Sequence, residues 1–219
     1  AFVHTDAVQA AGKVPVDVGA WGVDTAAFSA HKLHGPKGIG ALYVRRGVRI
    51  EPLAPGGGQE RRVRGGTENV PGIIAFGVAA RLARERLEED ATSMRRLRDR
   101  LEEGILAAVP GSRVVGALAP RLPNTSTILF ADAAGEALLI RLDLSGVAVS
   151  AGSACSSGSP EPPEALLALA IPAEEARCAL RFSLSRATRE AEIDAVLERL
   201  PRMVADTRAG VPALSETPS

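Results

Sequence analysis

The spacing of apolar and polar positions predicts short strands and turns in the first third of the chain. Two apolar runs of strand length, residues 23–28 and 39–44, flank the turn cluster GPKG at residues 35–38. At the start, residues 2–4 form an apolar run that gives way at once to polar residues. This pattern is typical of the end of a buried strand, and we expect the sequence to be part of a longer protein.

Residues 70–109 show the apolar periodicity of a helix. Leucine and isoleucine recur among arginine and glutamate at helical spacing, and Pro110 with Gly111 is expected to end the stretch. A long helical segment after a loop-rich one indicates a domain boundary near residue 75. The expected parts are a first domain at 1–75, a second at 76–208 and a flexible tail at 209–219.

The second part alternates between the two periodicities, which favours an α/β fold. The expected strands are 114–115, 126–130, 147–150 and 180–184, and the expected helices are 135–144, 164–170 and 189–206. Residues 151–163 are rich in Gly, Ser and Pro and are expected to form a loop.

Composition excludes several classes of protein. The 219 residues carry 26 lysines and arginines against 26 aspartates and glutamates, so bulk positive charge cannot drive binding to nucleic acid. No run approaches the roughly 18 apolar residues of a membrane helix, so no membrane association is expected. The start lacks the layout of a signal peptide, and two cysteines make no disulfide framework. We therefore expect a cytoplasmic protein.

Four clusters of polar residues carry groups that could do chemistry. They are residues 4–9 (HTDAVQ), 29–32 (SAHK), 64–69 (RGGTEN) and 152–158 (GSACSSG), the last considered together with Arg181. Each also has an ordinary explanation, because an aspartate after a strand commonly caps a turn. Cys155 lies among small polar residues, so core packing explains it poorly. Cys178 has Ala179 and Leu180 beside it, and we expect it to be a core residue.

Taken together, these residue types suit pyridoxal phosphate. That cofactor needs a lysine for a Schiff base, an aspartate for its ring nitrogen and donors for its phosphate. Lys32 and Asp6 follow consecutive strands, and Ser29 and His31 lie beside Lys32. The other two lysines, at positions 13 and 37, are expected in solvated turns. No metal site is expected, because no further ligand accompanies the two histidines at 31 and 34.

Five motifs resemble those of cysteine desulfurases of the NifS/IscS type, in order and in approximate spacing. They are HTDAVQ, FSAHKLHGPKGIGALYVRR, GGGQERRVRGGTEN, SAGSACSSG and ALRFSLSR. The resemblance covers all but the tail. It implies a pyridoxal-phosphate transferase of fold type I, with residues 1–75 as the later part of the cofactor domain and a smaller C-terminal α/β domain. The remaining part of the large domain would precede Ala1.

The resemblance also implies roles for single residues in the reaction. Lys32 would form the Schiff base and move the Cα proton of the substrate. Arg181 would hold the substrate carboxylate, for which a planar guanidinium is suited. Cys155 would be the nucleophile that takes the sulfur of L-cysteine as a persulfide and leaves L-alanine.

Five further residues would hold the cofactor if the resemblance is carried over position by position. Asp6 would pair with the ring nitrogen and Gln9 with the phenolic oxygen. Ser29 and His31 would bind the phosphate. Thr67 would reach the phosphate of the other subunit, which implies a homodimer.

Alternative functions stay open. One is another enzyme of the class-V aminotransferase fold, such as a selenocysteine lyase; another is a non-catalytic piece that only dimerises or docks a sulfur acceptor. The thiol of Cys155 argues against an aminotransferase, which needs none. The acceptor of the sulfur could be a scaffold protein for iron–sulfur cluster assembly or a protein that thiolates tRNA.

Overall fold

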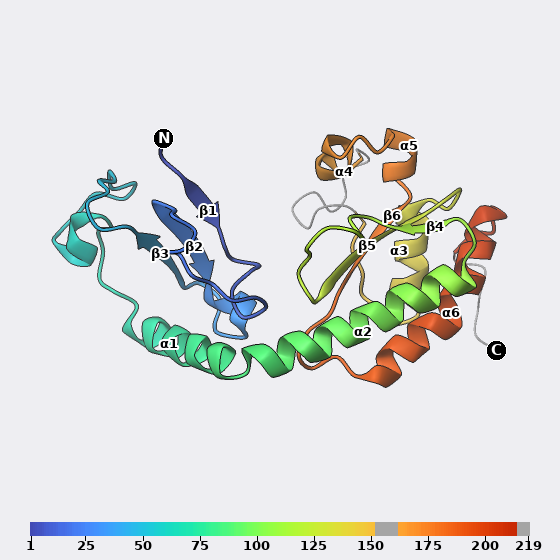
Figure 1. Ribbon diagram of the computed structural model, residues 1–219, viewed down its shortest axis with the longest axis horizontal. Coiled ribbons are helices and arrows are strands. Elements are labelled where there is room, and N and C mark those ends of the chain that lie inside the picture. The colour runs from blue at the N-terminus through green and yellow to red at the C-terminus, as the bar shows by residue number, and fades with distance from the viewer. Residues whose placement is uncertain (152–161, 214–219) are drawn as a thin grey trace. The chain divides into compact units, whose positions relative to one another are not determined.

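The computed structural model describes residues 1–151 and 162–213, and the chain divides into two compact units, Ala1–Asp90 and Ala91–Ser219 (Figure 1). Helix α1 (Val70–Glu85) belongs to the first unit, so the division falls after the boundary expected near residue 75. The reason is packing: Ala79 of α1 is buried, and its Cβ lies 3.1 Å from where a Cβ on Gly35 would be.

The first unit is built on a sheet of three strands in the order β1-β2-β3. They are β1 (His4–Asp6), β2 (Thr25–Ser29) and β3 (Gly40–Val44). Strands β1 and β2 are parallel, and β2 and β3 are antiparallel. The two predicted strands 23–28 and 39–44 are confirmed to within two residues. Phe2 and Val3 precede β1 and are exposed rather than buried.

The predicted helix 70–109 is two helices. Asn69 caps α1 by accepting a hydrogen bond from the Gly72 amide at 3.1 Å, with Pro71 in the first turn. Helix α1 ends at Glu85, where Arg86 leaves the helical conformation at φ −103° and ψ 3°. Helix α2 (Leu87–Ala108) then begins with the carboxylates of Glu88, Glu89 and Asp90, which favour a helix N-terminus.

The second unit is an antiparallel sheet with helices packed on it (Figure 1). Its strands, in the order β4-β5-β6, are β4 (Ser112–Val114), β5 (Thr125–Phe130) and β6 (Ala179–Ser183). Its other helices are α3 (Gly135–Leu144), α4 (Glu164–Ala168), α5 (Ala173–Ala176) and α6 (Glu190–Arg208). The sequence did not predict the one-turn α5, and it placed the first strand at residues 2–4 where β1 is His4–Asp6. No helix within the described ranges is long and apolar enough to cross a membrane.

The strand expected at 147–150 is wrong. Only Ser150 pairs there, as an isolated antiparallel bridge to Arg181. Val147 and Val149 instead pack, partly buried, against the core of the second unit. The apolar residues of 147–150 therefore reflect packing against the core, and in the described structure no strand pairs along the length of this segment.

The core of the second unit is aliphatic, as the low aromatic content requires. Helix α2 contributes Leu97, Leu101 and Ile105 at spacings of four, and all three are almost fully buried. They meet Ile128 and Phe130 of β5 in one cluster. Full burial of one such side chain stabilises the fold by about 1.5–3 kcal/mol.

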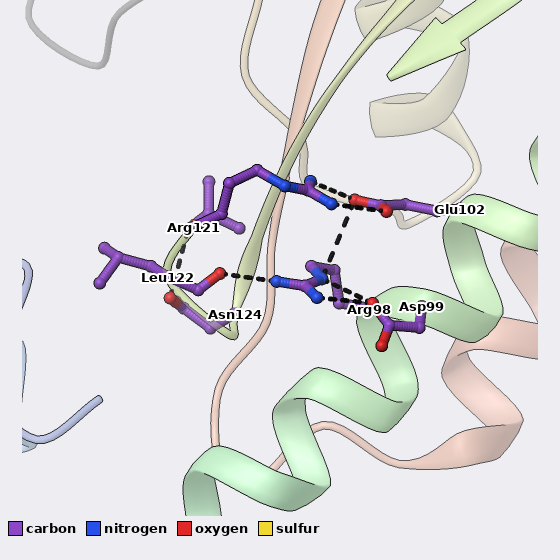
Figure 2. Close-up of polar contacts among 7 residues, drawn as sticks. Arg98, Asp99, Glu102, Arg121, Leu122 and Asn124 are labelled. Carbon is purple, nitrogen blue, oxygen red and sulfur yellow. Dashed lines mark hydrogen bonds and ion pairs between the residues drawn. The ribbon is translucent and has the colours of Figure 1, made fainter. Parts of the chain in front are cut away.

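A partly buried ion pair and a hydrogen bond join α2 to the segment that leads into β5 (Figure 2). Both terminal nitrogens of Arg121 donate to Glu102, at 2.6 and 3.0 Å, and Arg98 donates to the Leu122 carbonyl at 2.9 Å. Asn124 continues the connection, because its side-chain amide donates to the Leu184 carbonyl at 3.0 Å. These contacts hold the start of β5 against the end of β6, the strand that carries Arg181.

Glu102 is the carboxylate at the centre of this cluster. Burial opposes its ionisation, but the hydrogen bonds from Arg121 and the charges of Arg121 and Arg98 outweigh burial and lower its pKa. A lowered pKa means that the ionised group stabilises the fold at neutral pH. That contribution is lost as the pH falls through the lowered pKa.

We expect Glu102→Gln to lower the free energy of unfolding at neutral pH by about 1.5–3 kcal/mol, because the charge-assisted bonds to Arg121 are lost. The deficit should shrink as the pH falls below about 4.3, the ordinary pKa of a free glutamate, because wild-type Glu102 loses its charge as the pH passes through its lowered pKa. Urea denaturation followed by far-UV circular dichroism measures both. Glu103→Gln, on the exposed side of α2, is the control and should change little. A deficit that stays constant with pH would contradict the assignment.

Candidate functional site

The residues expected around Lys32 lie on one short turn after β2. The 3-10 turn η1 (Ala30–Leu33) follows Ser29 directly and buries Ala30 and Leu33, so that His31 and Lys32 are left exposed. The Ser29 hydroxyl and Nδ1 of His31 share a hydrogen bond of 2.7 Å. Three of the predicted residues are thus adjacent on one exposed surface.

Asp6 ends β1, the neighbour of β2. In the parallel register Asp6 lies opposite Ala27, two residues before Ser29. Because parallel strands end at the same edge of a sheet, Asp6 and the turn of Lys32 lie on the same edge. The Asp6 carboxylate is exposed and accepts a hydrogen bond from the Val8 amide at 2.9 Å. Gln9, also exposed, lies in the tight turn that follows.

Lys13 corrects one expectation from the sequence. It is half-buried rather than solvated, and its Nζ donates to the Gln9 carbonyl at 3.1 Å. Burial lowers the pKa of Lys13, and the positive charge of Lys32 lowers it further. Lys37 is exposed, as expected. Sequence reasoning missed Lys13 because no apolar pattern marks a lysine whose burial arises from a turn folding onto a neighbouring segment.

Gly12 brings Lys13 against η1 and α1. A Cβ at Gly12 would lie 2.7 Å from Cδ2 of Leu33 and 3.3 Å from Cβ of Ala83, and the residue has φ +72°. Both the space and the backbone conformation therefore require glycine. The contact fixes the turn after β1 onto the turn that carries Lys32.

Thr67 follows a loop that closes on itself. A Cβ at Gly65 would lie 2.8 Å from Cα of Gly56, and the Gly65 amide donates to the Ala54 carbonyl at 2.8 Å. Between these points lies the turn η2 (Gln59–Arg62). Thr67 is exposed, and no hydrogen bond within the described ranges joins it to the residues around Lys32.

Arg181 belongs to the other compact unit. Its backbone pairs with Ser150 in both directions, at 2.7 and 3.1 Å. Its Nε is buried and has no hydrogen-bond partner among the described residues, so the side chain retains an unused donor. Ser150 precedes Cys155 by five residues in the sequence, and Cys155 itself lies outside the described residues.

Cys178 has the environment of an unreactive thiol. It is half-buried, and its Sγ donates to the Glu174 carbonyl at 3.4 Å. Burial is the main cause of its raised pKa, so little thiolate is present at neutral pH. Cys178 is thus only partly buried, whereas the sequence predicted a core residue. In the described ranges no three His, Cys, Asp or Glu side chains gather as a metal site requires.

Residues 1–196 match the sequence model of the aminotransferase class-V family. The chain belongs to this family. It is 51% identical over 208 residues to a cysteine desulfurase of Gluconacetobacter diazotrophicus, which covers 95% of this chain and 52% of that protein. It is also 51% identical over 205 residues to the cysteine desulfurase NifS of Azotobacter vinelandii, covering 94% of this chain and 51% of that protein.

A solved structure also supports the predicted fold. The NifS-like protein of Rickettsia africae superposes with a TM-score of 0.84 at 34% identity, over 92% of this chain and 53% of that one. The predicted α/β fold and the resemblance to cysteine desulfurases are confirmed. The chain spans about half the length of the curated relatives it matches.

We expect Gly12→Ala to lower the free energy of unfolding of the first unit by about 2–4 kcal/mol. About 1–2 kcal/mol comes from the left-handed backbone and the rest from overpacking against Leu33. Gly22→Ala is the matched control, since Gly22 has φ +66° but nothing within 4 Å of its Cβ position. Denaturation followed by the fluorescence of Trp21, the single tryptophan of this sequence, compares the two. Equal losses would show that the contact with Leu33 contributes nothing.

Proposed function

We propose that this chain carries the cofactor lysine and the sulfur-accepting cysteine of a pyridoxal-phosphate cysteine desulfurase, which converts L-cysteine to L-alanine. The observation that carries the proposal is the common edge of β1 and β2. There a carboxylate, a hydroxyl, an imidazole and an exposed lysine lie together in a chain half identical to cysteine desulfurases. This donor set fits the ring, phosphate and aldehyde of the cofactor.

The cofactor, when bound, withdraws electrons from the carbon atoms of the substrate. Lys32 would hold the cofactor through Nζ, and the same amine would move the proton at Cα of the substrate. Asp6 keeps the ring nitrogen protonated through its carboxylate. Ser29 and His31 would bind the phosphate, one of them as the donor while the hydrogen bond between Ser29 Oγ and His31 Nδ1 fixes the orientation of both.

Gln9 and Thr67 complete the proposed binding of the cofactor. Gln9 donates its side-chain amide to the phenolic oxygen of the ring. Thr67, on its closed loop, serves the phosphate site of a second subunit, so that the active protein is a homodimer. The absence of hydrogen bonds between Thr67 and the Lys32 turn of the same chain, within the described ranges, is compatible with that role.

Arg181 orients the substrate by its carboxylate. A guanidinium presents two parallel N–H donors to a carboxylate, and Nε of Arg181 has no partner among residues 1–151 and 162–213, which leaves capacity for such a bond. The two backbone hydrogen bonds between Ser150 and Arg181 hold Arg181 in place on β6.

Cys155 accepts the sulfur. Its thiolate attacks Sγ of the bound cysteine and forms the S–S bond of a persulfide, while the Cβ–Sγ bond breaks and its electron pair stays on the carbon fragment. Protonation of that fragment gives alanine. The persulfide sulfur then passes to an acceptor, either a scaffold for iron–sulfur clusters or a protein that thiolates tRNA.

Lys32→Ala in the full-length protein should abolish the visible absorbance of covalently bound cofactor, because the amine proposed to form the Schiff base is removed. The overall fold should be retained, as judged by circular dichroism, because Lys32 is exposed. Lys37→Ala, an exposed lysine on the turn that follows, is the control and should keep the absorbance. Absorbance that survives gel filtration in Lys32→Ala would contradict the assignment.

Cys155→Ser should abolish sulfide and persulfide production while leaving the cofactor absorbance in place, because serine cannot form a persulfide. Cys178→Ser is the matched control and should change neither, since its thiol is half-buried with a raised pKa. Mass spectrometry after incubation with cysteine should find one added sulfur on the peptide of Cys155. Sulfur on the peptide of Cys178, or full turnover in Cys155→Ser, would overturn the mechanism. A wild-type protein that binds no cofactor would favour the non-catalytic alternative.

A further inference from the structure

The half-buried ammonium of Lys13 is not explained by the stability of the fold. Its hydrogen-bond acceptor is a neutral carbonyl, that of Gln9, at 3.1 Å. No carboxylate among residues 1–151 and 162–213 forms an ion pair with it, and the neighbouring charge that acts on it is that of Lys32. Partial burial of a cation under these conditions is unfavourable. A neutral side chain of similar size would be at least as stable there.

The position of Lys13 is nevertheless tightly constrained. Gly12 lies in contact with Leu33 of η1 and Ala83 of α1. On the other side, the Lys13 amide donates to the Ala10 carbonyl at 3.0 Å, and the Ala10 amide donates to the Ala7 carbonyl at 3.0 Å. The turn is thus attached to β1 at one end and to the Lys32 turn at the other. The Lys13 side chain reaches back over it to Gln9.

We propose that Lys13 is a positioning residue of the cofactor site: it holds the turn that carries Gln9 and adds a positive charge beside Lys32. This inference rests on the proposed function. The Lys13 ammonium fixes the Gln9 carbonyl, so the side chain of Gln9 leaves the turn from a fixed backbone. The phosphate and phenolic oxygen of pyridoxal phosphate are anionic, and a second cation at this edge favours their binding.

Three substitutions separate the two contributions of Lys13. Lys13→Arg keeps the charge and a donor, Lys13→Gln keeps a donor without the charge, and Lys13→Met keeps neither. Lys37→Met is the control, because it removes the charge of an exposed lysine on the neighbouring turn. All are made in the full-length protein.

The first readout is the affinity of cofactor-free protein for pyridoxal phosphate, titrated by absorbance. We expect Lys13→Met to weaken binding roughly tenfold, which corresponds to about 1.4 kcal/mol, and to shift the absorption maximum. Lys13→Arg should restore both, and Lys13→Gln should restore the absorption maximum but not the affinity. The midpoint temperature of thermal unfolding of the cofactor-free Lys13→Met protein should be unchanged or slightly higher. If Lys13 served only the stability of the fold, this temperature would fall.

The second readout needs no cofactor. Hydrogen exchange of the peptide spanning residues 7–14 should be faster in Lys13→Met than in wild type and normal in Lys13→Arg and Lys13→Gln. Unchanged exchange together with unchanged affinity in Lys13→Met would overturn the inference, as would a large drop in its thermal stability. A wild-type protein that binds no pyridoxal phosphate at all would overturn the proposed function instead, and this result is distinct from both.

Discussion

The parallel pairing of β1 with β2 is the constraint on which the proposed site depends. Parallel strands end at the same edge of a sheet, so the register that places Asp6 opposite Ala27 also places Asp6 on the edge where Ser29 and η1 begin. A shift of one residue would turn the Asp6 side chain to the opposite face of the sheet. The chain between the two strands must therefore be held in register.

Close packing at two glycine positions holds the chain between β1 and β2 in register. Gly12 leaves room for Leu33 and Ala83, and Gly35 leaves room for Ala79. Helix α1 thus contacts both the turn after β1 and the turn after β2. This explains why the first compact unit extends to Asp90 instead of ending near residue 75. The assignment of the two units as a cofactor domain and a smaller domain remains a prediction.

The elements could be predicted wherever one local pattern decided the outcome. Residues 135–144 form a helix with the predicted bounds, because its apolar face and flanking turns agree. The break at Arg86 has no proline or glycine to mark it, and the run 147–150 has strand composition but one pairing residue. The single pairing of Ser150 is with Arg181, a residue distant in sequence. Lys32, Asp6, Ser29 and His31 could be proposed from their residue types beside strand ends, and Gln9 and Thr67 from the motifs, whereas no local pattern marked the burial of Lys13.

Two sets of cations, one in each unit, differ in whether a carboxylate pairs with them. In the second unit Arg98 and Arg121 are compensated by Asp99 and Glu102, so each of these cations has a carboxylate partner. In the first unit Lys13 and Lys32 have no such carboxylate among the described residues, although both lie near the edge that carries Asp6. Charge left uncompensated by the protein is available to an anionic ligand. The contrast within one chain therefore supports the proposal that Lys13 and Lys32 serve the binding of an anionic ligand.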